Sequence, residues 1–195
     1  MRTILRSLIA IVAITAVFGL AYPAVMTGFA SLSFSAKAQG SLLHHDGKVV
    51  GSALAAQSFT SPRYFHERPS GTTPAYNAGA TTFANLGPTN PALAKAVDQQ
   101  VAAILALERP YNPGLTIGDI PVDAVTTSGS GIDPDISPAY AQLQAPRVAA
   151  VRNLQLSTVE RLIRQNTTGR SIGLLGEPGV NVLTLNLALD KLGGK

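Results

Sequence analysis

Residues that carry most enzyme chemistry are sparse in this sequence of 195 residues, and their spacing matches no catalytic pattern. The three histidines are His44, His45 and His66, and the nearest carboxylates are Asp46 and Glu67. Zinc sites commonly place two ligands on one helix face, as in H-E-x-x-H, whereas adjacent histidines in a turn rarely share a metal. We therefore interpret these residues as solvated turn residues, and we predict no metal site and no catalytic residue.

The run Ser128-Gly129-Ser130-Gly131 is a candidate for a hydrolase nucleophile or an anion-binding loop. A nucleophile elbow needs G-x-S-x-G between a strand and a helix, together with a matching histidine, and the spacing here differs. A glycine loop that follows a strand, here predicted over Ile120–Thr126, can still present backbone N–H groups to an anion. Asp133 and Asp135 lie close by in sequence and would repel phosphate. We favour an ordered glycine turn, with contact to a nucleotide or another ligand as the alternative.

A cluster of arginines marks the C-terminal third of the chain. The cluster consists of Arg147, Arg152, Arg161, Arg164 and Arg170. Glu160 is the one acidic residue between them. Two interpretations stay open: a solvated helical face, or a surface that contacts lipid head groups or an acidic partner. The net charge is +4, but there is no Lys/Arg block and only 6% of residues are aromatic, so nucleic-acid binding has little support. The lack of cysteine excludes disulfides and thiolate metal sites.

The N-terminal segment has the composition of a membrane span. Arg2 and Arg6 precede an uncharged run over residues 7–36, and the apolar stretch 8–30 is long enough to cross a hydrocarbon core that needs roughly 20 helical residues. By the positive-inside rule, residues 1–7 are a short cytoplasmic N-terminus and residues 31–195 a soluble domain outside the inner membrane, in the periplasm of a Gram-negative cell. The alternative is a cleaved signal peptide, whose apolar core is usually only about 7–15 residues.

The soluble part mixes helix and strand signals. Residues 42–50 predict a β-hairpin turned at Asp46-Gly47, and residues 60–91 predict a long ordered loop with four aromatic residues. Asn90 before Pro91 predicts a helix that ends at Pro110. A second helix is predicted from Pro138 to about Gln144, and a third helix from Pro146. A fourth helix is predicted to begin at a capping box, Ser157/Glu160, and to end at Gly169. Residues 180–192 predict a strand that leads into a helix. The fold class is an α+β soluble domain tethered by one N-terminal transmembrane helix.

Short motifs along about 170 residues carry a family resemblance. They include Gln39-Gly40-Ser41-Leu42, Gly47–Ser52, Tyr64-Phe65-His66, Arg68-Pro69-Ser70, Asn85–Pro91, Ser128–Pro134, Gln144 with Arg147-Val148-Ala149, Val180–Leu183 and Leu185–Asp190. In this order they resemble the C subunit of the bacterial potassium-importing P-type ATPase, the Kdp complex. A departure is Thr82-Phe83-Ala84, where the family usually has a Gly-Gly-Ser run.

The resemblance implies an accessory subunit rather than an enzyme. Its partners would be a channel-like potassium-binding subunit and the P-type ATPase subunit, together with membrane lipid, and the subunit would be needed for assembly of the complex. Such subunits are often described as catalytic chaperones that raise the ATP affinity of the ATPase subunit. In that description Gln144 would contact ATP, together with the loop Ser128–Gly131, and the chain would have no cofactor of its own.

The predicted topology conflicts with a direct ATP contact, because a domain outside the membrane cannot reach cytoplasmic ATP. We therefore keep an external domain over the potassium entrance as an alternative that needs no nucleotide contact. Such a domain could act on nucleotide affinity indirectly, if it bound one transport state better than another. A further alternative from another class is an envelope hydrolase, which would have a cleaved N-terminus and would depend on Ser130.

Overall fold

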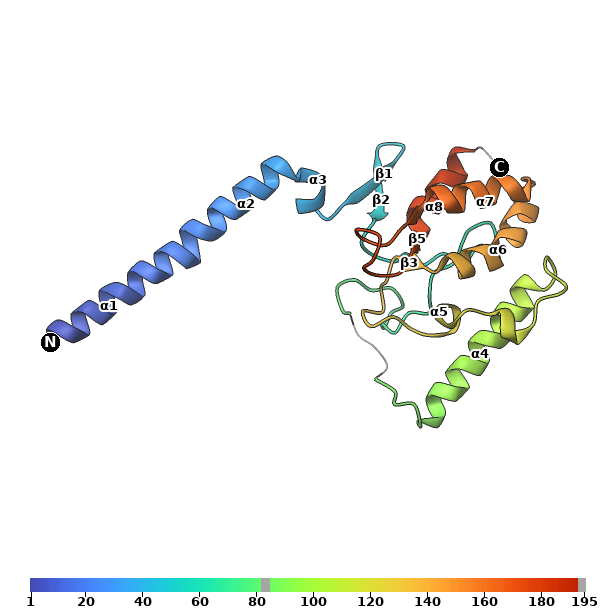
Figure 1. The fold of residues 1–195 in the computed structure, drawn as a ribbon, viewed down its shortest axis with the longest axis horizontal. Helices are drawn as coiled ribbons and strands as arrows, with labels where there is room; N and C mark the ends of the chain where they lie inside the picture. Colours follow the sequence, from blue (N-terminus) through green and yellow to red (C-terminus); the bar gives the residue numbers. More distant parts are fainter. Residues whose placement is uncertain (82–84, 193–195) are drawn as a thin grey trace. The chain divides into compact units, whose positions relative to one another are not determined.

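The computed structural model describes residues 1–81 and 85–192, which form two compact units, Met1–Leu42 and Leu43–Lys195 (Figure 1). The first unit is mainly helical, and the second contains helices together with two small antiparallel sheets. The predicted α+β class is therefore confirmed. The predicted departure at Thr82-Phe83-Ala84, and with it Phe83 of the long loop, lies outside the described residues.

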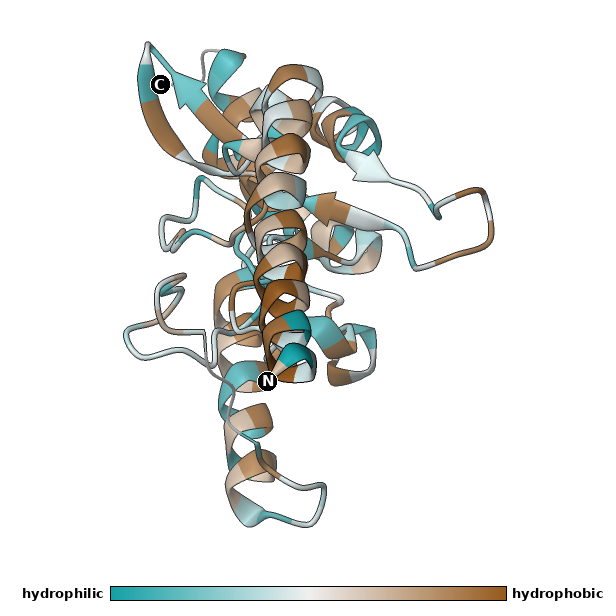
Figure 2. Cartoon of the chain, turned by 90° about the vertical axis from the view of Figure 1, so that its left-hand side faces the viewer, coloured by the Kyte–Doolittle hydropathy of each residue, from teal (hydrophilic) through white to brown (hydrophobic). Residues whose placement is uncertain are grey.

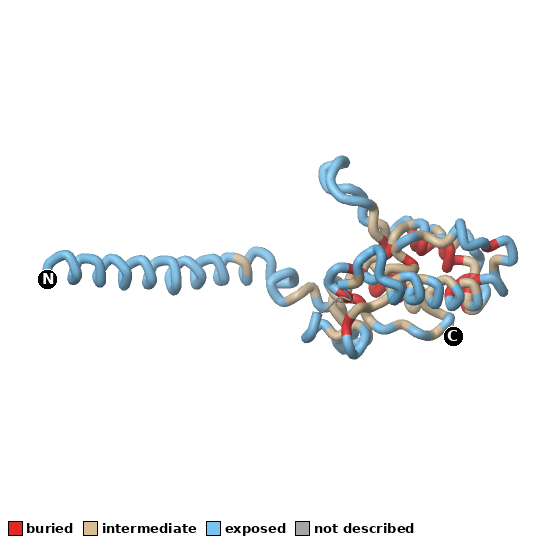
Figure 3. The backbone as a smooth tube through the Cα atoms, turned by 90° about the horizontal axis from the view of Figure 1, so that it is seen from below, coloured by how far each residue is buried: buried red, intermediate tan, exposed pale blue. Residues whose placement is uncertain are grey.

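The first unit is a helix of 32 residues, Arg2–Ser33, followed by the short α3 (Ser35–Ala38). The long helix consists of α1 (Arg2–Ile14), a π-helical segment η1 (Thr15–Ala21) and α2 (Tyr22–Ser33). None of its residues is buried (Figure 3), and apolar residues occupy most of its length (Figure 2). Within the described part of the chain, this is the one helix long and apolar enough to cross a membrane. A signal sequence would have the same character.

The π-helical segment has a local cause in Pro23. Proline has no N–H to donate, and its ring crowds the carbonyl four residues earlier, here that of Gly19. The preceding turn widens, and the Tyr22 N–H bonds to the Val17 carbonyl, five residues back. A π-turn of this kind lets the helix continue past the proline instead of breaking.

The second unit begins with the hairpin that the sequence predicts. Strands β1 (Leu42–His45) and β2 (Lys48–Ser52) are joined at Asp46 and Gly47, which both have positive φ angles of 49° and 74°. A two-residue turn with two positive φ angles matches the twist of the strands. At Gly51 an added Cβ would lie only 2.9 Å from a methyl group of Leu183, so β2 approaches α8 (Val182–Lys191) closely at that point.

A long helix and two short ones follow the irregular segment. Helix α4 (Pro91–Glu108) starts as predicted, with the Asn90 side chain accepting the Ala92 N–H at 2.9 Å. The predicted strand over 120–126 is wrong, because this stretch contains the single-turn helix α5 (Val122–Val125), which follows the 3₁₀ turn η2 (Ile117–Asp119). The Thr126 hydroxyl donates to the Val122 carbonyl and closes the turn at 2.8 Å. The β-branched residues of the stretch 120–126 favour a strand only where a neighbouring strand pairs with them, and here the stretch is not part of a sheet.

Helix α6 (Pro138–Val151) runs through a position where the sequence predicts an end. Its Ser137 cap is confirmed, since the Ser137 hydroxyl accepts the Tyr140 N–H at 3.0 Å. The predicted stop near Gln144 and the separate helix from Pro146 are wrong, and the two form one helix. A proline inside a helix costs about 3 kcal/mol. The buried face of α6 spans both sides of Pro146, so packing offsets this cost.

A three-stranded sheet and two further helices complete the unit. Strands β3 (Asp135–Ile136), β5 (Gly179–Asn181) and β4 (Thr167–Thr168) pair antiparallel in that order. Helix α7 (Leu156–Gln165) packs against α6 and α8. Its predicted capping box is wrong, because the cap residue is Gln155 and makes no side-chain hydrogen bond, and α7 ends before Gly169. The predicted strand and helix at the C-terminus are confirmed as β5 and α8.

The core lies between these helices and the segment that precedes α4, and Figure 3 shows that the buried positions are all in the second unit. Its most enclosed apolar side chains are Phe65, Ile136, Val148, Val159, Ile163, Val180, Val182, Leu185 and Leu189. Phe65 comes from a segment with no regular secondary structure, yet it is completely buried. The irregular segment is therefore part of the core and must have its backbone polar groups satisfied.

Candidate functional site

Two side-chain amides hold the irregular segment between α6 and α8. The Asn186 amide accepts the Phe65 N–H at 2.9 Å and donates to the Phe65 carbonyl at 3.0 Å. The Gln144 amide does the same for His66, at 2.8 and 3.1 Å. Each amide replaces the pair of hydrogen bonds that a neighbouring strand would make, so the segment is fixed like a strand although it lies between helices. We call residues 62–67, with the side chains that bind them, the buried clamp.

Arg147 is the centre of the clamp. Its side chain is fully buried and donates to the Glu108 carboxylate at 2.8 Å, the Gln144 amide at 2.9 Å and the Tyr64 carbonyl at 2.9 Å. It also donates to the carbonyl of Pro62. A buried charge is tolerated when it is paired and hydrogen-bonded. Here each of the three guanidinium nitrogens donates at least one hydrogen bond.

Arg152 makes a second, more peripheral set of contacts. It donates to the Arg63 carbonyl at 2.7 Å and to Asp190 at 2.7 Å, and its guanidinium lies 4.8 Å from the centre of the Tyr64 ring. The Tyr64 hydroxyl donates to the same carboxylate at 3.1 Å. These contacts tie the clamp to α8.

The arginine cluster predicted from the sequence therefore divides into two groups. A solvated face is wrong for Arg147 and Arg152, which are buried structural residues. Arg161 and Arg164 are exposed on α7, and Arg170 is exposed and pairs with both oxygens of Glu177 at 2.8 Å. Only this second group is available to lipid head groups or to an acidic partner.

Gln144, the residue predicted to contact ATP, is 1% exposed. Its oxygen accepts two hydrogen bonds and its nitrogen donates one, all within the clamp. A contact between Gln144 and a nucleotide would require α6 to separate from residues 62–67. The loop Ser128–Gly131, which was predicted to contact ATP together with Gln144, is described in full. No hydrogen bond joins it to Gln144.

The loop Ser128–Gly131 uses its serine hydroxyls for its own backbone. The Ser128 hydroxyl accepts the Gly131 N–H at 3.0 Å, and the Ser130 hydroxyl accepts the Ile132 N–H at 3.2 Å. Gly131 has a φ of 73°, and its carbonyl accepts the Ser70 hydroxyl at 2.7 Å. The expected ordered glycine turn is thus observed, after a helix rather than the predicted strand. Gly129 and Ser130 are the exposed positions of the loop.

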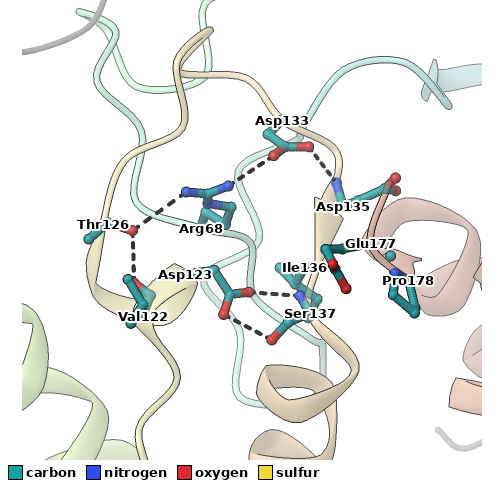
Figure 4. Close-up of a pocket in the computed structure, with 11 residues that line it drawn as sticks. Arg68, Val122, Asp123, Thr126, Asp133, Asp135, Ile136, Ser137, Glu177 and Pro178 are labelled. Atoms are coloured by element: carbon teal, nitrogen blue, oxygen red, sulfur yellow. Dashed lines mark hydrogen bonds and ion pairs between the residues drawn. The ribbon is translucent and has the colours of Figure 1, made fainter. Parts of the chain in front are cut away.

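A surface pocket of about 530 Å³ lies beside this loop (Figure 4). Asp123, Asp133, Asp135 and Glu177 line it, with Arg68 as the one basic residue among its described lining residues. Arg68 donates to Asp133 at 3.1 Å, and Asp123 accepts both the N–H and the hydroxyl of Ser137. Burial raises the pKa of Asp135, a hydrogen bond from Asn181 lowers it, and the nearby Asp133 raises it. Four carboxylates against one guanidinium disfavour a triphosphate in this pocket.

A second cavity, of about 350 Å³, lies between residues 59–76 and α4. Glu67 and Glu108 line it and are almost completely buried, at 4% and 2% exposure. Burial raises the pKa of Glu67 to about 8, against the lowering effect of the backbone N–H groups of Glu67, Gln57 and Phe59. Burial also raises the pKa of Glu108, although Arg147 acts in the opposite direction. The interpretation of Glu67 as a solvated turn residue is wrong.

The sequence does contain a signal for both acids. Glu67 follows Tyr64 and Phe65 in a run with three successive large rings, and Glu108 lies four residues after Ile104, on the apolar face of α4. An acid at a position where the pattern requires a buried side chain indicates a paired or functional carboxylate.

The histidines do not come together. His44 and His45 lie on β1, and His45 is 3.6 Å from the exposed Asp46. His66 is half-buried, its ring lies 3.0 Å from the Ser61 carbonyl, and burial lowers its pKa. Within residues 1–81 and 85–192, no group of three His, Cys, Asp or Glu residues could hold a metal ion.

The chain matches a family model over residues 4–191, described as "KdpC: K+-transporting ATPase, c chain". The chain belongs to the KdpC family. The match covers the long helix, the clamp and both cavities. A relative from Methylococcus capsulatus, a potassium-transporting ATPase KdpC subunit, is 54% identical over 91% of this chain and 92% of its own. KdpC subunits of Burkholderia vietnamiensis and Bradyrhizobium diazoefficiens are 51% and 47% identical and cover the whole chain.

Proposed function

We propose that this chain is the non-catalytic accessory subunit of a high-affinity, ATP-driven potassium import complex. The observation that carries the proposal is the match to the KdpC family over residues 4–191, which includes the helix and the domain alike. The partners are a channel-like potassium-binding subunit and a P-type ATPase subunit, and the main task is to hold these partners in one assembly.

The helix Arg2–Ser33 anchors the subunit in the bacterial inner membrane. Two arginines near its start and a single lysine after its end favour the N-terminus in the cytoplasm. The domain then lies outside, in the periplasm of a Gram-negative cell, where it can sit over the potassium entrance. This placement excludes contact with cytoplasmic ATP.

An effect on the ATP affinity of the partner is therefore indirect in our proposal. The enclosure of Gln144 supports this route, because its amide is already occupied by His66 and Arg147. A subunit that binds one transport state more tightly than another shifts the population of the ATPase subunit towards that state. The exposed Gly129 and Ser130 are the part of the predicted nucleotide loop that a ligand could reach directly.

An ordered apolar tip between β4 and β5 supports a role in assembly. Ile172, Leu174 and Leu175 are 84%, 78% and 62% exposed, and the pair Arg170–Glu177 closes the base of the tip. Contiguous exposed aliphatic side chains are typical of surfaces that another protein covers. We propose that a partner subunit of the same complex covers this tip.

The topology test uses the lack of native cysteine. Ser157→Cys on α7 and Ser7→Cys near the start of the helix each introduce one exposed thiol, and both variants are expressed with the partner subunits. A membrane-impermeant maleimide applied to cells with a permeabilised outer membrane should label Ser157→Cys and spare Ser7→Cys until lysis. The reverse pattern would place the domain in the cytoplasm and make direct ATP contact the mechanism to pursue.

Assembly is tested separately by affinity purification of the full chain from membranes. Two larger membrane proteins should co-purify, identified by mass spectrometry as a potassium channel-like protein and a P-type ATPase. Recovery of the chain alone, with a shortened N-terminus in its intact mass, would contradict the proposal.

A further inference from the structure

A third cavity, of about 270 Å³, lies between β1, the end of α7 and one side of α8 (Figure 1). His44, His45 and Lys191 are the residues of its described lining that can carry a charge, and no carboxylate is among that lining. The two cavities described above have the opposite character, because acids line both. The third cavity is therefore the one of the three that suits an anion.

Two facing surfaces form the walls of this cavity. Its lining residues on α8 are Thr184, Leu187, Ala188 and Lys191, whose spacing of three, four and seven residues places them on one face of the helix. On β1, Leu43 and His45 alternate with more exposed residues and so share the half-buried face of the strand. Each wall therefore combines an apolar side chain with a group that can bind an anion.

The basic groups are accessible and are not neutralised by the fold. Lys191 is exposed, and within residues 1–81 and 85–192 its ammonium group makes no hydrogen bond and no ion pair. The neighbouring acid Asp190 is engaged by Arg152 and by the Tyr64 hydroxyl. The His45 side chain is 39% exposed and lies 3.6 Å from Asp46, whose side chain is 92% exposed and therefore largely hydrated.

The cavity follows the long helix closely in the chain. The helix ends at Ser33 and the cavity lining begins at Leu43, so nine residues separate them, four of which form α3. A connection of this kind is at most roughly 30 Å long. With the helix anchored in a membrane, it keeps the cavity within reach of the head-group layer, where lipid phosphates are concentrated.

We propose that this cavity binds a phosphate group, with Lys191 as its charged contact and His45 as a second donor, and that the head group of an anionic phospholipid supplies the phosphate. Free inorganic phosphate shares this chemistry but has no apolar part, whereas the glycerol and first acyl carbons of a lipid match the walls at Leu43 and Leu187. The volume is near the lower end of the range for small-ligand sites, roughly 300 Å³, and suits a head group. Only the choice of a lipid rests on the proposed membrane anchor, because the cavity belongs to the domain alone.

The test is calorimetric titration of the purified full-length chain in a non-ionic detergent with dihexanoylphosphatidylglycerol, a short-chain anionic phospholipid. Titration into detergent without protein gives the background from mixing with micelles. We expect saturable binding of one lipid. Lys191→Gln should lower the affinity by about tenfold or more, as expected for the loss of one charged hydrogen bond.

Lys95→Gln is the matched control, because Lys95 is an exposed lysine on α4 and lies outside the cavity lining. This variant loses the same charge and should bind the lipid as the native chain does. Thermal unfolding of both variants shows that they are folded, which the exposure of both lysines leads us to expect. The titration uses this chain alone, so its failure is distinguishable from a failure of the topology or co-purification tests.

Sodium phosphate distinguishes the two sources of the phosphate group. Lipid binding that is weakened in Lys191→Gln but not in Lys95→Gln supports a phospholipid head group. Binding of sodium phosphate alone, with the same loss in Lys191→Gln, supports free phosphate as the ligand of the cavity. Absence of binding for both probes, or binding that Lys191→Gln leaves unchanged, would overturn the proposal.

Discussion

Gln144→Ala is the substitution that best separates a structural role of Gln144 from a nucleotide contact. The native amide makes three hydrogen bonds, to the N–H and the carbonyl of His66 and to the guanidinium of Arg147. After truncation, all three partners stay buried without it. A neutral hydrogen bond contributes about 1 kcal/mol and one to a charged group about 1.5–3 kcal/mol. The expected loss in the free energy of unfolding is therefore about 3–5 kcal/mol.

A loss of that size is a large part of the free energy of unfolding of a whole domain, which is typically about 5–15 kcal/mol. Urea unfolding of the full-length chain in detergent, followed by circular dichroism, measures it directly. Hydrogen exchange detected by mass spectrometry should show loss of protection at Phe65 and His66, while α7 stays protected. Gln142→Ala on the exposed face of α6 is the control and should change stability by less than about 0.5 kcal/mol.

The opposite result would refute this reasoning. If Gln144→Ala lost less than about 1 kcal/mol, kept the clamp protected and still lowered the ATP affinity of the intact complex, then Gln144 would act on the nucleotide and not on the fold. The amide would then have to leave His66 during the transport cycle.

Three further outcomes follow from single features of the domain. Gly51→Ala should lose about 1–3 kcal/mol in urea unfolding, because the added Cβ would lie 2.9 Å from a leucine methyl group of α8; Gly129→Ala, with open space around it, is the control. Between pH ~4.5 and ~8, Glu67 keeps a proton in the folded chain that the unfolded chain releases, so its contribution to stability falls as pH rises, by at most about 1.4 kcal/mol per pH unit. The unfolding free energy of the native chain minus that of Glu67→Gln should therefore decrease as the pH rises over this range. An increase of this difference with rising pH would contradict the prediction. The double variant Ile172→Ser and Leu174→Ser should keep the melting temperature of the isolated chain but reduce co-purification of the larger subunits; unchanged co-purification would remove the tip as a docking surface.

Local chemistry was readable from the sequence where the interacting atoms are a few residues apart. Asn90 and Ser137 cap their helices through side-chain bonds to N–H groups two and three residues away, as predicted. The turn at Asp46 and Gly47 is equally local. The length and composition of the N-terminal helix needed no tertiary information either.

The errors occur where distant residues decide the outcome. The helix end predicted near Gln144, ahead of Pro146, assumed an isolated helix, but the buried face of α6 continues on both sides of that proline. Likewise, no spacing rule could pair Arg147 with Glu108, 39 residues away, or Gln144 with His66, 78 residues away. These pairs depend on how the irregular segment is inserted into the core, which the pattern of residues 60–91 does not specify.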